Sequence, residues 1–325
     1  MLEIDPDNRA GKNALAALMN NAGVTKGKTG QFGEEVATLE NALSLDPKNP
    51  QIKKNLANAY FNLALDKGKS GKVSEEVEFL RKARKLAPKD SLIGENLGRA
   101  LSDLAVLKGK AGDLSGQIAL LKEGLSISPK DPVTRKNLSA AYNNYAVDQA
   151  TNLKVKERIA NLKKSMKLDP GNKSAKNNLS NLLVKEAIRE YTQGSRANAV
   201  DLLKKAQKVD PGNKAVRRNL AAVYHNEALK KGDAGEHKSE IGLLYKALKL
   251  TPSNDKIKTD LALAYNDYAV DYGKKGDSMR ELRYLRKALE LDPTNEAIRE
   301  NLERAQKKTA VRKKRSKKAS KQKKR

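Results

Sequence analysis

The chain has 325 residues, with 66 lysines and arginines against 39 aspartates and glutamates, so its net charge at pH 7 is +27. It contains no cysteine, which excludes disulfides and thiolate metal sites. No apolar run approaches the ~20 residues that a membrane-spanning helix requires, so no segment of this sequence is expected to span a membrane.

Prolines recur along the chain at a fixed interval of forty-one positions: Pro6, Pro47, Pro88, Pro129, Pro170, Pro211, Pro252 and Pro293. Only Pro50 and Pro132 fall outside this series. A fixed period of this size is typical of solenoids, in which each unit buries its apolar face against its neighbours. We therefore expect an array of about seven repeats over residues 1–306.

The first element of each repeat is a predicted helix that begins just after the proline. An Asn or Asp two residues after each proline can accept hydrogen bonds from the first backbone N–H groups of the helix: Asn8, Asn49, Asp90, Asp131, Asn172, Asn213, Asn254 and Asn295. Leucine stands nine residues after every proline; in the complete repeats a small residue follows it, and a large residue, often tyrosine, comes three positions later. This spacing predicts a helix that packs closely against a partner.

A turn and a second helix complete the repeat. The turn glycine stands at a constant distance before the next proline in six cases: Gly30, Gly71, Gly112, Gly194, Gly235 and Gly276. Leucine then stands eight residues before each following proline, from Leu39 to Leu285, with an aliphatic residue three positions earlier. The pattern predicts a helix–turn–helix unit and an all-α fold.

This pattern resembles the tetratricopeptide repeat. The small residue after the leucine, the tyrosine, the alanine five residues before the proline and the "LDP" ending carry the resemblance, which implies a right-handed superhelical solenoid. In two respects the chain departs from the family. The residue twelve before the proline, small in the family, is usually Glu or Gln here (Glu35, Glu76, Gln117, Glu240, Glu281). The repeat is also seven positions longer than the usual length of about 34 residues. Because the turn glycine keeps its distance from the following proline, the extra residues are expected in the first helix.

The two ends of the chain differ from the repeats between them. Met1–Pro6 has the sequence of the end of a second helix, so the chain begins inside a repeat and end-to-end self-assembly is one hypothesis. Near the other end we expect a capping helix, because the polar Gln306 replaces a large apolar residue. Residues 307–325 contain 12 basic and no acidic residues, which is typical of a disordered interaction arm.

A row of asparagines is the first candidate site. It stands eight residues after the prolines and comprises Asn55, Asn96, Asn137, Asn178, Asn219 and Asn301, interrupted by Asp260; a second row contains Asn62, Asn144 and Asn226. The resemblance implies that the first row faces a concave groove. Primary amides donate and accept hydrogen bonds, so such a row can bind the backbone of an extended peptide. The alternative is that these amides satisfy neighbouring backbone groups or water. A lysine clamp for a terminal carboxylate, known in the family, is not expected, because Gln51, Leu92 and Val133 stand at its positions.

Basic residues form the second candidate site. Pairs recur on the predicted second helices, including Lys163, Lys164, Lys204 and Lys205, and the tail contains Arg312, Lys313, Lys314 and Arg315. The resemblance places the second helices on the convex surface. Such a surface and tail can attract nucleic acid or another polyanion without reading its sequence. The alternative is a solvated surface with no ligand.

Catalysis is not expected. His225 and His237 are the only histidines and lie twelve residues apart across a turn, which gives no spacing for a metal site, and no cofactor is predicted. The sequence therefore predicts a non-enzymatic scaffold whose groove holds an extended segment of a partner protein, with the basic tail adding electrostatic attachment. The alternatives are a solenoid that binds nucleic acid or a ribonucleoprotein, and a self-assembling repeat protein. The expected location is the cytoplasm, or the nucleus in a eukaryote because of the basic tail.

Overall fold

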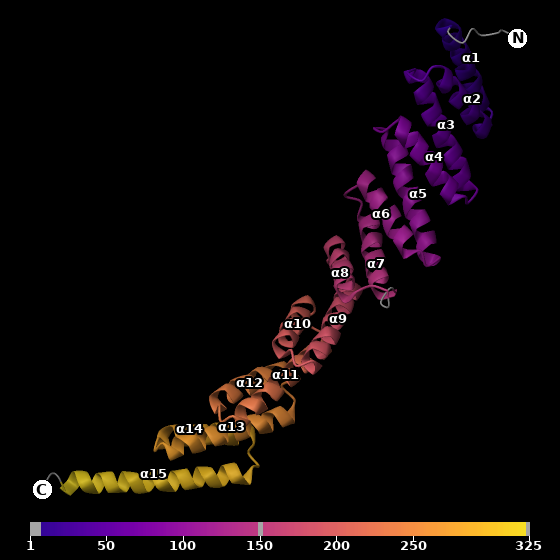
Figure 1. The fold of residues 1–325 in the computed structure, drawn as a ribbon. Coiled ribbons are helices and arrows are strands. Elements are labelled where there is room, and N and C mark those ends of the chain that lie inside the picture. The colour runs from indigo at the N-terminus through magenta and orange to yellow at the C-terminus, as the bar shows by residue number, and fades with distance from the viewer. Residues whose placement is uncertain (1–7, 149–151, 323–325) are drawn as a thin grey trace. The chain divides into compact units, whose positions relative to one another are not determined.

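A computed structural model describes residues 8–148 and 152–322, which form fifteen α-helices and no strand (Figure 1). In chain order the helices are α1 (Arg9–Lys28), α2 (Phe32–Leu45), α3 (Pro50–Lys69), α4 (Val73–Leu86), α5 (Ser91–Lys110), α6 (Leu114–Ile127), α7 (Pro132–Asp148), α8 (Val155–Leu168), α9 (Lys173–Thr192), α10 (Arg196–Val209), α11 (Lys214–Asp233), α12 (His237–Leu250), α13 (Asp255–Lys274), α14 (Ser278–Leu291) and α15 (Glu296–Gln322). The expected all-α fold is confirmed. The segment Met1–Pro6, expected to end a second helix, lies outside the described residues.

Two compact units divide the chain, Met1–Ala175 and Lys176–Arg325, with the division inside α9. The first unit contains α1 to α8, and the second contains most of α9 and the helices after it. Within the first unit, and from α11 onward in the second, odd-numbered helices pack against the even-numbered helix that follows. The handedness of a superhelix stays a prediction.

Helix length alternates along the chain as the sequence predicts. The first helix of a pair has 20 residues in α1, α3, α5, α9, α11 and α13, whereas every second helix from α2 to α14 has 14. The residues beyond the usual repeat length therefore lie in the first helices. Seven residues add about 10 Å to a helix, so each first helix presents two further turns of surface.

The expected N-caps all form. In each of the eight cases, from Asn8 to Asn295, the side-chain oxygen accepts a hydrogen bond from a backbone N–H in the first turn of the helix that follows. Each cap satisfies a donor that the helix itself cannot pair.

The turn glycines have the backbone conformation that their position requires. All six have positive φ, between 70° and 86°, and they are the only residues with positive φ in the described parts of the chain. L-amino acids with a Cβ rarely adopt this conformation, which explains the recurrence of glycine. Leu153 stands at the corresponding position of the remaining repeat, and α8 there begins with a different cap, in which the carboxylate of Glu157 accepts from the backbone N–H of Lys154.

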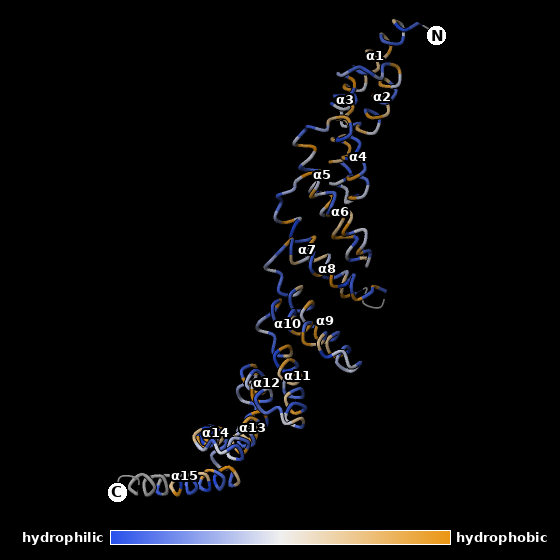
Figure 2. The backbone as a smooth tube through the Cα atoms, turned by 60° about the vertical axis from the view of Figure 1, so that its left-hand side comes forward, coloured by the Kyte–Doolittle hydropathy of each residue, from blue (hydrophilic) through white to orange (hydrophobic). Residues whose placement is uncertain are grey.

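The core runs from one repeat into the next. The leucines eight residues before each proline are at most 1% exposed: Leu39, Leu80, Leu121, Leu162, Leu203, Leu244 and Leu285. One apolar cluster joins Leu39 of α2 to Leu56 of α3, Ala83 of α4 and Ile93 of α5. Figure 2 shows hydrophobic and hydrophilic residues interleaved along the helices rather than gathered in blocks. Each helix therefore has one face for its neighbours and another for solvent or a ligand.

The segment from residue 307 was expected to be a disordered arm, whereas the structure describes it as helix as far as Gln322. Helix α15 continues without a break to Gln322. From Glu296 to Gln322 the sequence contains no proline or glycine, and it is rich in lysine, arginine and alanine, which favour helix. Charge repulsion suggested disorder, but the helix propensity of these residues is high and Ala305 anchors α15 in a buried cluster with Ala269 and Leu285.

Candidate binding surfaces

The asparagine row lies on the first helices, and its members are half-buried. Three members contact the residue thirty-five positions earlier, on the preceding first helix. Asn55 Nδ2 donates to Asn20 Oδ1 at 2.8 Å, Asn301 Nδ2 donates to Asn266 Oδ1 at 2.9 Å, and His225 Nε2 lies 2.5 Å from Asp260 Oδ2. These bonds tie neighbouring first helices together and fix the orientation of the amides.

Two other members of the row bond within their own helix instead. The residues thirty-five positions before Asn96 and Asn219 are Phe61 and Val184, which offer no side-chain acceptor. Asn96 Nδ2 donates to Leu92 O at 2.8 Å, and Asn219 Nδ2 donates to Ala215 O at 2.9 Å. In these four asparagines, part of the hydrogen-bonding capacity of the amide is therefore used by neighbouring groups of the chain. Asn137 and Asn178 are half-buried like the others.

The second asparagine row is more exposed. Asn144 and Asn226 are exposed and Asn62 is half-buried. Asn144 accepts a hydrogen bond from Asn143, and Asn226 Nδ2 donates to the Tyr191 hydroxyl at 3.2 Å. Both rows thus lie on the first helices with part of their amide surface accessible.

The basic pairs of the second helices are exposed, but some of their members contact aromatic rings or carboxylates of the chain. In four repeats a lysine of the second helix lies over the ring of the recurring tyrosine of the first: Lys82 over Tyr60 at 5.7 Å, Lys164 over Tyr142 at 5.3 Å, Lys246 over Tyr224 at 5.9 Å and Lys287 over Tyr265 at 5.6 Å. These cation–π contacts give the recurring tyrosine a structural role that the sequence alone did not indicate. Lys205 pairs with Asp201 at 2.6 Å, whereas the exposed Lys163 and Lys204 have no ion pair among the described residues.

The basic residues of the tail lie on α15. Arg312 Nη1 donates to Gly276 O and Ser278 Oγ, both at 3.1 Å, so this side chain fastens α15 to the turn before α14. Lys314 is exposed. The side chains of Lys313 and Arg315 lie outside the described part of the structure.

The Glu or Gln twelve residues before the proline is accommodated by a glycine in the first helix. A Cβ at Gly27, Gly68, Gly109, Gly232 or Gly273 would lie within 2.9 Å of the corresponding Glu or Gln side chain. In these pairs, the glycine of the first helix therefore provides the space for the longer side chain of the second helix. Burial raises the pKa of Glu35, Glu76 and Glu240, and Glu35 Oε2 has no hydrogen-bond partner among the described residues.

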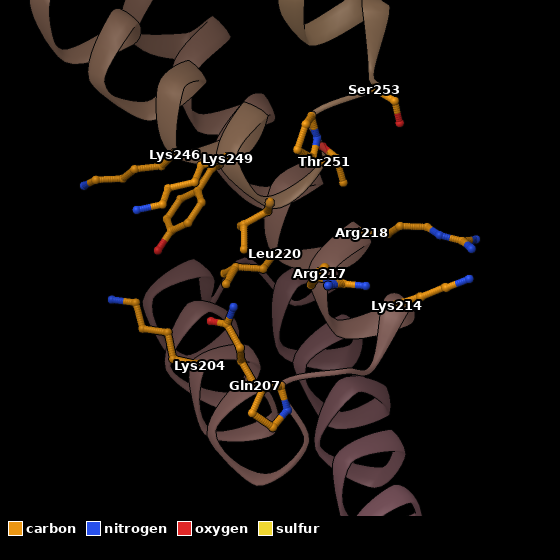
Figure 3. Close-up of a pocket in the computed structure, with 14 residues that line it drawn as sticks. Lys204, Gln207, Lys214, Arg217, Arg218, Leu220, Lys246, Lys249, Thr251 and Ser253 are labelled. Atoms are coloured by element: carbon orange, nitrogen blue, oxygen red, sulfur yellow. The ribbon is translucent and has the colours of Figure 1, made fainter.

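Sequence reasoning missed a basic cavity in the second unit. It has a volume of about 760 Å³ and lies between the C-terminal ends of α10 and α12 and the first half of α11 (Figure 3). Six basic residues line it and no acidic one does: Lys204, Lys214, Arg217, Arg218, Lys246 and Lys249. They come from three helices, so only the folded chain brings them together. In the sequence, the one signal for this cavity was that basic residues stand on both sides of Pro211.

The described residues contain no group of acidic or histidine side chains arranged to hold a metal ion. His225 contacts Asp260, and His237 contacts Glu240 on its own helix. None of the described helices combines the length and the apolar character needed to cross a membrane.

Residues 16–49 match the family model described as tetratricopeptide repeat. This segment carries a tetratricopeptide repeat. The matched segment contains most of α1, all of α2 and the turn that leads to α3, and its key residues recur in phase along the rest of the array. No curated protein sequence matches the chain.

Solved tetratricopeptide repeat structures resemble the chain at low identity. A repeat protein from Bacteroides fragilis is 19% identical, with 77% of this chain and 97% of that chain covered and a TM-score of 0.33. A thermophilic protein from Thermus thermophilus is 22% identical, with 64% and 98% covered and a TM-score of 0.22. YrrB, described as having an unusual peptide-binding site, is 14% identical, with 61% and 88% covered and a TM-score of 0.23. At these values the likeness concerns the fold alone.

Proposed function

We propose that the chain is a non-enzymatic protein-binding scaffold that holds an extended segment of a partner protein on the amide-bearing face of its first helices. The basic end of α15 adds electrostatic attraction to the same partner. The fold supports this proposal, because a solenoid presents the same helix face repeatedly along its length.

The observation that carries the proposal is the fixed orientation of the amides. Asn55 uses one amide hydrogen for Asn20 and accepts from Gln51 Nε2 at 2.9 Å, which leaves its other amide hydrogen for a ligand. Asn96 and Asn219 are held by a carbonyl one turn earlier in their own helices. An amide held in one orientation loses little side-chain entropy when it binds a peptide backbone. Each such bond contributes about 1 kcal/mol, so affinity requires several repeats.

The test is a triple substitution, Asn96→Ala, Asn137→Ala and Asn219→Ala, assayed with fluorescein-labelled unstructured peptides of mixed sequence. We expect an affinity loss on the order of 100-fold, because three amide contacts at about 1 kcal/mol each are removed. The matched control is Asn41→Ala with Asn198→Ala, which removes exposed amides from second helices. Equal affinity of the triple variant and the wild type, with unchanged circular dichroism, would overturn the proposal.

A further inference from the structure

The cationic cavity of the second unit has a defined arrangement of charge around an apolar floor. Leu220, Leu250, Pro211 and Pro252 contribute the apolar part of the lining. In Figure 3, Lys204 and Lys246 extend to one side of Leu220, and Lys214 and Arg218 extend to the other. The cavity is therefore apolar in the middle and positively charged at both ends.

The charges of this cavity have no ion-pair partner among the residues that the structure describes. Lys204, Lys214, Arg218, Lys246 and Lys249 make no ion pair with any described residue, and Lys246 Nζ lies 5.9 Å from the centre of the Tyr224 ring. Clustered like charges repel one another, and an anion bound between them relieves this repulsion. The cavity volume is also within the range of ligand-binding sites.

The first unit contains a corresponding cavity with a different charge. It lies four repeats earlier in the sequence, has a volume of about 460 Å³, and is lined by Leu56, Tyr60, Lys82 and Lys85 at the positions of Leu220, Tyr224, Lys246 and Lys249. Glu40 stands where the second unit has Lys204, and the Tyr60 hydroxyl donates to it. The repeat pattern alone therefore does not produce a uniformly basic cavity. The basic character of the second cavity depends on residues such as Lys204 that the cavity of the first unit does not repeat.

We propose that the cavity between α10, α11 and α12 binds an acidic peptide segment in which an apolar side chain is flanked by carboxylates. This inference rests on the proposed scaffold function and assigns a second contact site to it. Apolar residues of the peptide lie on Leu220 and Leu250, while carboxylates on either side pair with the lysines and arginines at the two ends. Single-stranded nucleic acid fits less well, because its bases require open aromatic faces. Tyr224 is the only aromatic residue of the lining, and Lys246 covers its ring.

The experiment measures anisotropy of a labelled peptide that contains two leucines flanked on each side by four glutamates. We expect Lys204→Glu with Arg218→Glu to weaken binding by about tenfold or more, because one contact at each end is reversed in sign. Lys110→Glu with Lys122→Glu makes the same charge change at exposed positions of the first unit and is expected to change the affinity less than twofold. A peptide with glutamine in place of glutamate is expected to bind at least tenfold more weakly than the acidic peptide.

The remaining arms separate this inference from its alternatives. Equal losses of peptide affinity in the cavity variant and in the charge-matched control would overturn the proposal. A cavity variant that no longer binds a labelled RNA of equal charge but still binds the peptide would also overturn it. If the triple asparagine variant loses the acidic peptide while the cavity variant keeps it, the peptide lies on the amide row instead. Far-ultraviolet circular dichroism checks that each variant is folded.

Discussion

At the scale of single residues, a carboxyl group that is buried against a glycine lowers the stability of the folded chain when it is charged. Glu35 is 6% exposed, and burial raises its pKa. A raised pKa means that the fold favours the protonated acid, so its contribution to stability is present at pH values below the ordinary value of 4.5 and is lost as pH rises through the pKa of the folded state. At pH 7 the buried charge therefore destabilises the chain.

We expect Glu35→Gln to raise the free energy of unfolding at pH 7, on the order of 1 kcal/mol, because it removes the charge but keeps the shape. At pH 4 the difference should disappear, since the acid is then largely protonated. Thermal unfolding followed by circular dichroism at both pH values measures this. Gln117 already occupies the same repeat position. Glu34→Gln is the control, because Glu34 is exposed and pairs with Lys26 at 3.0 Å; a gain there equal to that of Glu35→Gln would contradict the explanation.

Residue types that act locally were predictable from the sequence, whereas contacts between distant residues were not. Asn49 caps α3 through backbone groups two and three residues away, so its role follows from local chemistry. The pairing of Asn55 with Asn20 depends on how two helices are placed, and the sequence left both of its interpretations open. The basic cavity around Leu220 depends on three helices and could not be read from spacing alone.

At the scale of elements, the caps and the turn glycines determine where the helices begin and end. Gly71 and Gly242 both have open space where a Cβ would lie, but only Gly71 has positive φ, at 75°. Because neither position has a neighbour that a Cβ would contact, a comparison of alanine substitutions at the two positions isolates the effect of backbone strain. The same reasoning explains why the helix ends were predictable and the extent of α15 was not. Glycine and proline mark ends, but residues 307–322 contain neither, and charge alone was a poor guide to their conformation.

We expect Gly71→Ala to destabilise the first unit by roughly 1–2 kcal/mol, because the alanine must adopt a left-handed conformation. Gly242→Ala lies within α12 and should stabilise the second unit by about 0.5–1 kcal/mol, because alanine favours the helix. Urea unfolding monitored by circular dichroism measures both changes. Two substitutions with the same sign of effect would show that φ is not the determining difference.

At the scale of the whole molecule, the excess of positive charge is concentrated toward the end of α15. The segment 307–325 carries 12 of the 66 basic residues and no acidic one. Because Ala305 lies in the buried cluster at the base of α15, a chain that ends at Gln306 keeps this cluster and loses the basic extension, together with the contact of Arg312 to the turn before α14. This division allows the electrostatic role of the extension to be tested apart from the repeat array.

We expect the full chain to bind a labelled mixed-sequence RNA at least tenfold more tightly than residues 1–306 at about 0.15 M salt, because the extension neutralises several phosphates. The dependence of log affinity on log salt should be less steep for the truncated chain, with a change of about 0.7 for each phosphate that is no longer neutralised. Fluorescence anisotropy at two salt concentrations measures both quantities. A full-length variant with Lys307, Lys308, Lys313 and Lys314 replaced by glutamine keeps the helix and removes four of the twelve positive charges, so its affinity and its salt dependence should move part of the way toward those of the truncated chain if charge is the cause. If residues 1–306 bind as tightly and with the same salt dependence, the exposed lysines of the second helices are the polyanion surface, and the extension of α15 is not the attachment arm.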